Sequence, residues 1–259
     1  SEHVQRFPNE TRIIATGANS VVLFQRDKVY KYGDEEVLEG EMECLESIAS
    51  PYVVRCIGHN YQDPTAALNF EIENIELEYI TGKTLEQTLV QAGQLAPQQA
   101  MKYASNILQG LIDMREAQYW YHRDIRPANI MIDQEYDKAV LIDFGTATKN
   151  KDAVSQYNRR YGTVKGHFAN DLVSVGQVLY KMVTGQHLFA ESPSMECTQE
   201  AQRIADERDR VYSDESGKLL QTYIQHVYDN VHDDQIGKVI MECLQADRDD
   251  HQRIMEMFT

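Results

Sequence analysis

Three oxygen-bearing side chains lie beside two short apolar segments, 130–132 and 139–142. Asp124 and Asn129 precede the first segment, and Asp143 directly follows the second. Both segments are predicted strands, so the adjoining loops would present a carboxylate, an amide and a second carboxylate together. Such a set suits phosphoryl transfer, in which a protein mainly positions reactants and neutralises charge. Asp124 would accept a hydroxyl proton, and Asn129 and Asp143 offer hard oxygen ligands to Mg²⁺.

The order of these residues resembles the catalytic core of eukaryotic-type protein kinases. His122-Arg123-Asp124 is followed by Asn129, five positions after the aspartate, and then by Asp143-Phe144-Gly145. Either tripeptide alone is a weak signal, but here both occur in order, at hairpin spacing and beside predicted strands. The alternative is that these charged residues belong to ordinary turns between strands.

The N-terminal part of the chain is predicted to form three strands, 11–16, 21–25 and 28–32, because β-branched residues alternate there with polar ones. The turn after the first strand resembles the glycine-rich loop that covers ATP phosphates in kinases. Only one glycine of that loop is kept, since alanine and serine replace the outer two, at Ala15 and Ser20. The resemblance implies that the nucleotide contacts Gly17, Ala18, Asn19, Ser20 and Val22.

Lys31 lies at the middle of the third predicted strand, between apolar neighbours. The resemblance implies that its ammonium contacts the α- and β-phosphates and is held by a glutamate of the next helix, predicted over 34–47. Several glutamates compete for this role, and Glu41 fits the resemblance best, with Leu45 one turn later packing toward Phe144. The alternative is a surface lysine whose charged end reaches solvent.

Two further strands are predicted over 52–58 and 70–80, and the second leads into a segment that resembles the hinge between kinase lobes. The resemblance implies that adenine pairs with the backbone of Glu78 and Ile80, with Leu77 at the back of the pocket. Val29 and Met131 complete the implied ATP-binding set.

The remainder of the chain is predicted to be mainly helical. Thr84 is an expected N-cap, and Asp171 is expected to begin a central helix that ends at Gly185 and to bond the catalytic-loop backbone. The helix starting at Pro97 has one apolar face, which we interpret as core. The predicted helices span 84–91, 97–118, 171–185, 200–209, 217–231 and 234–246.

Two departures from the kinase pattern bear on the substrate, one on the acceptor residue and one on peptide docking. Arg126 stands where serine/threonine kinases carry lysine, and the arginine-alanine pattern of tyrosine kinases is absent, which favours serine or threonine as the acceptor. The Ala-Pro-Glu motif is missing before Asp171, and His251 aligns with the arginine that normally pairs with its glutamate. The peptide-docking platform is therefore predicted to be reduced or rebuilt.

Arg123 precedes the proposed catalytic aspartate, and in the family such an arginine can bind a phosphate on the activation segment. It can equally bridge backbone groups, so both roles stay open. The candidate phosphorylation sites, near Arg159-Arg160, are Thr148, Ser155, Tyr157, Tyr161 and Thr163.

Composition limits the class of protein. The 259 residues are 42% hydrophobic and 25% charged, as in ordinary globular proteins, and no apolar run reaches the roughly 18 residues of a membrane helix. The N-terminus also shows no signal-peptide pattern. The net charge of −16 argues against nucleic-acid binding and fits either a basic protein partner or a solvated acidic surface. Four cysteines without a CxxC pair, Cys44, Cys56, Cys197 and Cys243, predict buried free thiols, a reducing compartment and no zinc site.

Together these features predict an α+β, two-lobed protein-kinase-like fold in a single catalytic domain. An N-lobe of antiparallel sheet plus one helix would span about 1–79, and a mainly helical C-lobe about 80–259. The predicted function is that of an ATP- and Mg²⁺-dependent protein serine/threonine kinase, with autophosphorylation possible and with Lys31, Asp124 and Arg126 as catalytic residues. The expected location is the cytoplasm, of the producing cell or of a host cell that receives the protein.

Two alternatives stay open. One is a pseudokinase or scaffold that binds ATP, which the reduced glycine loop favours. The other is a kinase-like phosphotransferase for a small molecule, of the aminoglycoside or choline kinase type, against which Arg123 and the intact Asp143-Phe144-Gly145 argue.

Overall fold

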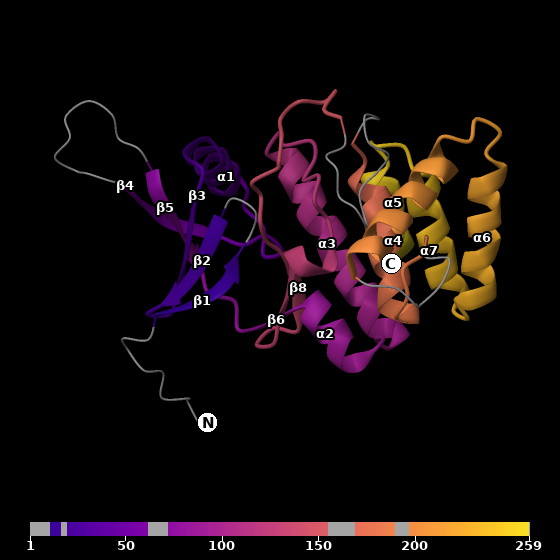
Figure 1. Cartoon of the computed structure of the whole chain (residues 1–259), viewed down its shortest axis with the longest axis horizontal. Coiled ribbons are helices and arrows are strands. Elements are labelled where there is room, and N and C mark those ends of the chain that lie inside the picture. The colour runs from indigo at the N-terminus through magenta and orange to yellow at the C-terminus, as the bar shows by residue number, and fades with distance from the viewer. Residues whose placement is uncertain (1–10, 17–19, 62–71, 155–168, 190–196, 259) are drawn as a thin grey trace.

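A five-stranded antiparallel sheet with one helix lies at one end of the molecule, and a mainly helical part with a small sheet lies at the other (Figure 1). The computed structural model describes residues 11–16, 20–61, 72–154, 169–189 and 197–258, with the side chains of 61 and 197–201 left out. This architecture confirms the predicted α+β fold with an N-terminal sheet and a helical C-terminal part.

The large sheet has the strand order β1-β2-β3-β5-β4. Its strands are β1 (Thr11–Thr16), β2 (Ser20–Gln25), β3 (Lys28–Gly33), β4 (Cys56–Tyr61) and β5 (Ile72–Glu78). Arg26 and Asp27, which join β2 to β3, both have positive φ, 52° and 63°. A two-residue hairpin turn needs this conformation to match the right-handed twist of the strands that it joins. The first three predicted strands are therefore confirmed to within one residue.

The strand predicted over 52–58 is wrong in its first half. Leu141 N donates to Tyr52 O at 2.8 Å, and Val54 N donates to Leu141 O at 3.0 Å. Residues 52–54 therefore pair with the C-terminal part of the chain, and β4 begins only at Cys56. The predicted strand 70–80 also runs two residues too far at its C-terminal end, because β5 (Ile72–Glu78) stops at Glu78, whereas residues 70 and 71 lie outside the described residues.

Helix α1 (Glu35–Ser47) begins directly after β3 and confirms the helix predicted over 34–47 to within one residue. The side chain of Asp34 caps it by accepting a hydrogen bond from Val37 N at 3.4 Å. Its buried face carries Leu38, Cys44 and Leu45 against the sheet, and Glu41 lies on that same face with 0% exposure. A carboxylate is thus carried into the interior by an otherwise apolar helix face.

A three-stranded sheet, β6 (Gly82–Thr84), β7 (Ile130–Asp133) and β8 (Lys138–Leu141), opens the C-terminal part. Gly82 has φ 156°, and a Cβ there would lie 1.9 Å from Ile132 O, so only glycine fits where β6 meets β7. Helix α2 (Leu85–Ala92) follows at once, with the predicted N-cap Thr84 in a capping box. The turn η1 (Pro127–Asn129) leads into β7.

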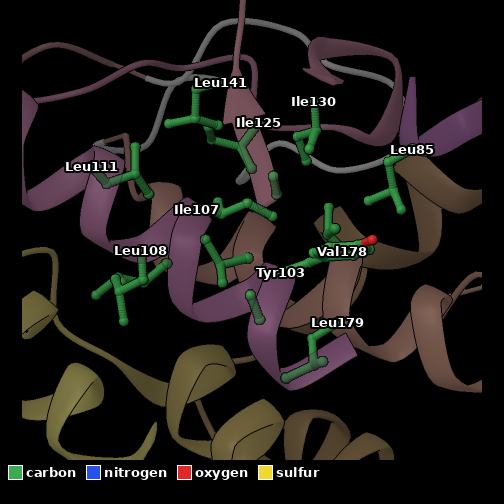
Figure 2. Packing of buried hydrophobic residues seen from close by; sticks show 14 of the residues in the cluster. Leu85, Tyr103, Ile107, Leu108, Leu111, Ile125, Ile130, Leu141, Val178 and Leu179 are labelled. Atoms are coloured by element: carbon green, nitrogen blue, oxygen red, sulfur yellow. The ribbon is translucent and has the colours of Figure 1, made fainter. Parts of the chain in front are cut away.

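Helices α3 (Pro97–Glu116) and α4 (Asp171–Thr184) form the centre of the C-terminal part, and buried side chains from both meet Ile125, Ile130 and Leu141 (Figure 2). The apolar face predicted for α3 is buried throughout. Gly185 ends α4 in the left-handed conformation, at φ 73°. The remaining elements are α5 (Cys197–Tyr212), α6 (Lys218–Asn230), α7 (Asp234–Gln245), α8 (His251–Met255) and η2 (Glu256–Phe258).

The predicted lobe boundary near residue 79 falls between the end of β5 and the start of β6. That the whole chain forms one catalytic domain stays a prediction. Cys44 and Cys243 are free thiols with 0% exposure, whereas Cys56 is half-buried. In the described ranges, no helix combines the length and the apolar character needed to cross a membrane.

Candidate active site

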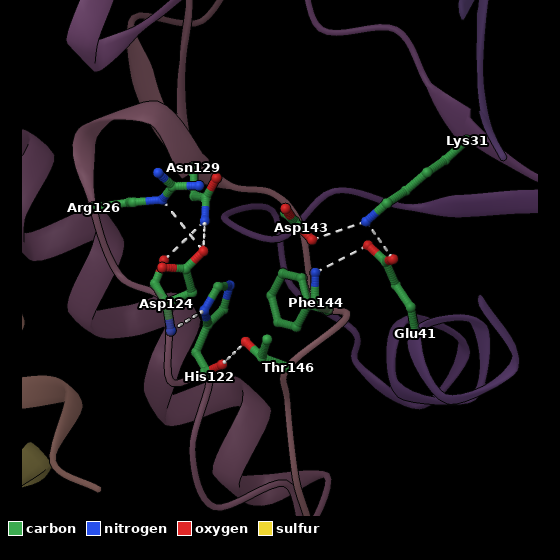
Figure 3. Close-up of polar contacts among 9 residues, drawn as sticks. All are labelled: Lys31, Glu41, His122, Asp124, Arg126, Asn129, Asp143, Phe144 and Thr146. Carbon is green, nitrogen blue, oxygen red and sulfur yellow. Dashed lines mark hydrogen bonds and ion pairs between the residues drawn. The ribbon is translucent and has the colours of Figure 1, made fainter. Parts of the chain in front are cut away.

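Lys31 brings the two parts of the site together. It lies on β3 between β2 and β5, opposite Val22 and Ile75, and is 5% exposed. Its Nζ lies 2.5 Å from Glu41 Oε2 and 2.8 Å from Asp143 Oδ1 (Figure 3). The glutamate chosen from the sequence is therefore the one that pairs with Lys31, and the surface-lysine alternative is wrong.

The charges of Lys31 and Asp143 shift each other's pKa toward the ionised forms. Burial alone would lower the pKa of Lys31, but the carboxylates of Glu41 and Asp143 outweigh burial and raise it. Burial would likewise raise the pKa of Asp143, and the Lys31 ammonium holds it below its ordinary value instead. Burial also raises the pKa of the Glu41 carboxyl, and this rise is opposed by Lys31 and by the Phe144 amide, which donates to Glu41 Oε1 at 2.9 Å.

The backbone turns sharply at Asp143, whose φ of 63° lies in the left-handed region that residues other than glycine seldom adopt. The next side chain, Phe144, is 1% exposed and meets the ring of His122 edge-on, with 4.6 Å between centroids. The turn thus directs the Asp143 carboxylate toward Lys31 while Phe144 packs beside the catalytic loop (Figure 3).

The catalytic loop brings the polar side chains of Asn129 and Arg126 to that of Asp124. Asn129 Nδ2 donates to Asp124 Oδ2 at 2.6 Å and to Asp124 O at 3.0 Å, and Arg126 Nε lies 3.3 Å from Asp124 Oδ2 (Figure 3). The side chain of Asp124 is 23% exposed and that of Arg126 is 43% exposed. The three predicted residues are therefore together, with a carboxylate that reaches solvent.

Asp171 fixes the backbone of this loop, as predicted. Its carboxylate is 3% exposed and accepts hydrogen bonds from His122 N at 2.7 Å and Arg123 N at 2.9 Å. Arg123 Nε in turn donates to the backbone oxygen of Thr146 at 2.7 Å, and binding of a phosphate by this arginine stays a prediction. Of its proposed phosphate partners, only Thr148 lies within the described residues; Ser155, Tyr157, Tyr161 and Thr163 lie outside them.

The residues predicted to bind adenine lie partly on adjacent strands. Val29 on β3 pairs with Leu77 on β5, and Lys28 pairs with Glu78. Val22 and Ile80 are partly buried against the main core, and Met131 is a half-buried residue of β7. Ser20 begins β2, whereas Gly17, Ala18 and Asn19 lie outside the described residues. Contact of this set with a nucleotide stays a prediction.

The donor set around Asn129 and Asp143 fits Mg²⁺. The Asn129 amide uses its NH₂ group on Asp124, which directs its carbonyl oxygen away from that carboxylate (Figure 3). Asp143 contributes an ionised carboxylate through its lowered pKa. Within the described part of the chain no group of three or more His, Cys, Asp or Glu could hold a metal, and Mg²⁺ usually takes only one or two carboxylates together with phosphate oxygens.

Two contacts between the loops were not anticipated from the sequence. Thr146 Oγ1 donates to His122 O at 2.7 Å, and Ile142 N donates to Asn129 O at 3.0 Å. The only sequence signal for Ile142 is its place at the end of an apolar run, and Thr146 gives none. Both contacts hold the segment around Asp143 against the catalytic loop.

Comparisons with known proteins agree with this geometry. Residues 21–258 match the protein kinase domain family. The chain is 30% identical over 180 residues to the serine/threonine-protein kinase PrkC of Bacillus subtilis, covering 60% of this chain and 26% of that protein. It is 29% identical over 126 residues to CBL-interacting protein kinase 33 of Oryza sativa subsp. japonica, covering 49% of this chain and 26% of that protein.

The fold also occurs in solved structures. A crystal structure of Rad53 1-466 in complex with AMP-PNP superposes with a TM-score of 0.67 at 18% identity, over 96% of this chain and 64% of that one. The chain spans about a quarter of the length of the two curated relatives. Because the family match covers nearly the whole chain, this protein belongs to the protein kinase superfamily.

Proposed function

We propose that this chain is a protein serine/threonine kinase that transfers the γ-phosphoryl group of ATP to a protein hydroxyl. The observation that carries the proposal is the buried Lys31 ammonium, 2.5 Å from Glu41 and 2.8 Å from Asp143, in the same site as the Asp124–Asn129 pair. One loop supplies a proton acceptor, and both loops supply oxygen ligands for Mg²⁺. Phosphoryl transfer needs such positioning and charge neutralisation.

Each side chain has a role that follows from its surroundings. Lys31 remains charged because two carboxylates raise its pKa, so it can neutralise the α- and β-phosphates. Asn129 and Asp143 would hold Mg²⁺, which offsets the charge that develops on the phosphate oxygens. Arg126, whose guanidinium is 43% exposed, can donate two hydrogen bonds to the transferring group.

Asp124 orients the acceptor. Its partly exposed carboxylate is held by Asn129 Nδ2 at 2.6 Å, which fixes the direction of its oxygens. As the new bond forms between phosphorus and the acceptor oxygen, the bond to the β–γ bridging oxygen of ATP breaks, and Asp124 accepts the hydroxyl proton. ATP would lie between the two loops and the adenine-binding set on β2, β3 and β5.

Serine or threonine as the acceptor, and the protein as its own substrate, belong to the proposal. Arg126-Pro127 and the name of the relative PrkC, a serine/threonine-protein kinase, support serine or threonine. The net charge of −16 supports a basic protein substrate, and a cytoplasmic site of action fits the free thiols. Thr148 is the candidate autophosphorylation site within the described residues.

The proposal is tested by transfer of labelled phosphate from Mg-ATP to the protein itself and to generic basic proteins. Asp124→Asn removes the proton acceptor and is expected to lower the rate by about 10² to 10⁴. Asp143→Ala removes a metal ligand and should abolish transfer, whereas Asp229→Asn, at an exposed aspartate of α6, is the control.

Phosphoserine or phosphothreonine that disappears in both active-site variants would establish the kinase. ATP-dependent thermal stabilisation without transfer to any protein would instead support a pseudokinase. Transfer only to a small molecule, such as an aminoglycoside or choline, would support the other alternative and overturn the proposal.

A further inference from the structure

The segment 246–251, between α7 and α8, contacts both described ends of the activation segment, which comprises the residues between Asp143 and Asp171. Arg248 Nη1 donates to Lys151 O at 2.6 Å, and Arg248 Nη2 lies 3.8 Å from Asp152. Asn170 Nδ2 donates to Ala246 O at 2.8 Å. The described stretch that ends at residue 154 and the one that begins at residue 169 are therefore both bonded to the same short connection.

The same two ends also contact each other and the catalytic loop. Ala169 N donates to Ala153 O at 3.0 Å, which closes the segment at its base. Thr146 bonds His122 O on one side of the catalytic loop, and Asp171 bonds its amides on the other. The described ends of the activation segment are thus bonded to each other and to the loop that carries Asp124.

Lys151 makes several of the contacts at this base. Its carbonyl accepts hydrogen bonds from two donors, Arg248 Nη1 and Tyr121 OH, the latter at 3.0 Å. Its ammonium lies 3.8 Å from the ring centroid of Trp120, a cation–π contact. Trp120 and Tyr121 pair with Thr148 through Trp120 N→Thr148 O at 2.8 Å and Thr148 N→Tyr121 O at 3.0 Å. Backbone contacts at Thr148 and side-chain contacts at Lys151 therefore hold the same short stretch, 148–151.

Arg115, at the end of α3, keeps Arg248 in place. Its guanidinium bonds Arg248 O and Asp249, approaches His251 Nδ1 at 2.8 Å and stacks on Trp120 at 4.7 Å. Arginine only donates, so His251 Nδ1 accepts. Burial, and then Arg115, lower the pKa of His251 to about 3, which keeps the imidazole neutral and able to accept near neutral pH.

We propose that Arg248 is a positioning residue for the protein substrate, in place of the glutamate–arginine pair that the sequence lacks. Held by Arg115, it fixes the Lys151 carbonyl and so both ends of the segment beside Asp124. This inference rests on the proposed kinase function and names a determinant of substrate positioning for it. Removing Arg248 leaves Tyr121 as the one remaining donor described at that carbonyl.

The test compares Arg248→Ala with Tyr121→Phe and with Arg253→Ala. Arg253 is the matched control, because it lies in the same C-terminal region and pairs with Glu242 and Asp250. In the full chain, Arg248→Ala should speed hydrogen exchange at the amides of Thr148 and Ala169 and shift the emission of the single tryptophan, Trp120. The KM for a protein substrate should rise about five- to tenfold, while the KM for ATP stays within about twofold.

Tyr121→Phe should give smaller changes in the same direction, and Arg248→Lys should restore part of the KM. Arg248→Ala that matches Arg253→Ala in exchange and emission would overturn the inference, as would faster exchange with an unchanged KM for the protein substrate. Absence of phosphate transfer by the unsubstituted chain would refute the proposed function alone. Exchange and emission would still decide whether Arg248 holds the segment.

Discussion

The β3–α1 half of the site and the catalytic-loop half are held in place by different forces. On the first, Lys31 and Glu41 are 5% and 0% exposed, and opposite charges stabilise each other inside the protein. On the second, Asp124 and Arg126 are 23% and 43% exposed at their side chains. Their position comes from the loop backbone, which Asp171 fixes from α4.

Because of this difference, substitutions in the two halves should differ in how much they affect stability. A buried ion pair that loses one partner leaves an uncompensated charge, which costs about 3–5 kcal/mol. A carboxylate that reaches solvent has no such penalty, so its substitution affects the reaction more than the fold. Substitutions in the β3–α1 half should therefore lower stability and activity together, and those of exposed catalytic-loop side chains should lower activity alone.

Lys31→Met should give the largest loss of stability, about 3–5 kcal/mol, because Glu41 would remain buried with only the Phe144 amide as a described donor. Urea unfolding measures this loss directly. Lys28→Met is the control on the same strand, since Lys28 forms an exposed pair with Glu76. Equal losses in the two variants would show that the buried pair does not distinguish this half.

Asp171→Asn tests the backbone support of the other half. The amide oxygen can accept one of the two hydrogen bonds, from His122 N or Arg123 N, and the amide NH₂ would then face the other N–H. One unsatisfied buried donor costs about 1–3 kcal/mol, so we expect about 2 kcal/mol together with a lower rate of transfer. Asp229→Asn on the exposed face of α6 is the control. A stable but inactive Asp171→Asn protein would place Asp171 in the chemistry instead.

The two halves of the site were predictable because each has a local signature in the sequence. Alternation predicts β2 and β3, and the buried face of α3 follows from helical spacing. The partner of Lys31 came from the family resemblance, since several glutamates of α1 have similar local surroundings. Burial of Glu41 on the core face of α1 now gives the physical reason for that choice.

Long-range pairings were not predictable in the same way. Residues 52–54 have the composition of a strand, yet they pair with Leu141, far along the chain, and not with β5. The Arg115–His251 contact likewise joins residues 136 positions apart. Neither has a local pattern, because their partners are set by how the sheet and helices pack, and sequence periodicity reports only which face is buried.

Gly40→Ala tests the β3–α1 half by a substitution that should stabilise it. Gly40 is exposed in the interior of α1, and a Cβ there would meet nothing within 4 Å. Alanine is therefore expected to raise the free energy of unfolding by about 0.5–1 kcal/mol through helix propensity. Kinase activity should stay unchanged, and lower stability in urea would show that α1 is strained at this position.

Asp137→Asn should have the smallest effect and tests the outer support of the catalytic-loop half. Asp137, in the turn between β7 and β8, accepts from Lys102 Nζ at 2.5 Å, Tyr103 OH at 2.8 Å and Gln99 Nε2 at 2.9 Å. Asparagine tolerates its φ of 48° and keeps one acceptor oxygen for Tyr103 and Gln99, so the charge and the acceptor for Lys102 are removed together. Because the Lys102–Asp137 ion pair is exposed, the loss in the free energy of unfolding should stay below about 1 kcal/mol.

The pH dependence of that loss identifies its cause. The hydrogen bond from Lys102, followed by that from Tyr103, lowers the pKa of Asp137. The carboxylate therefore contributes stability above its unfolded pKa of about 3.9, and this contribution disappears as the pH falls through the lower folded value. The difference between the two proteins should be equal at about pH 7 and pH 5 and should shrink below about pH 4. A difference that changes between pH 7 and pH 5 would mean that a titrating group other than the Asp137 carboxylate carries the loss of stability.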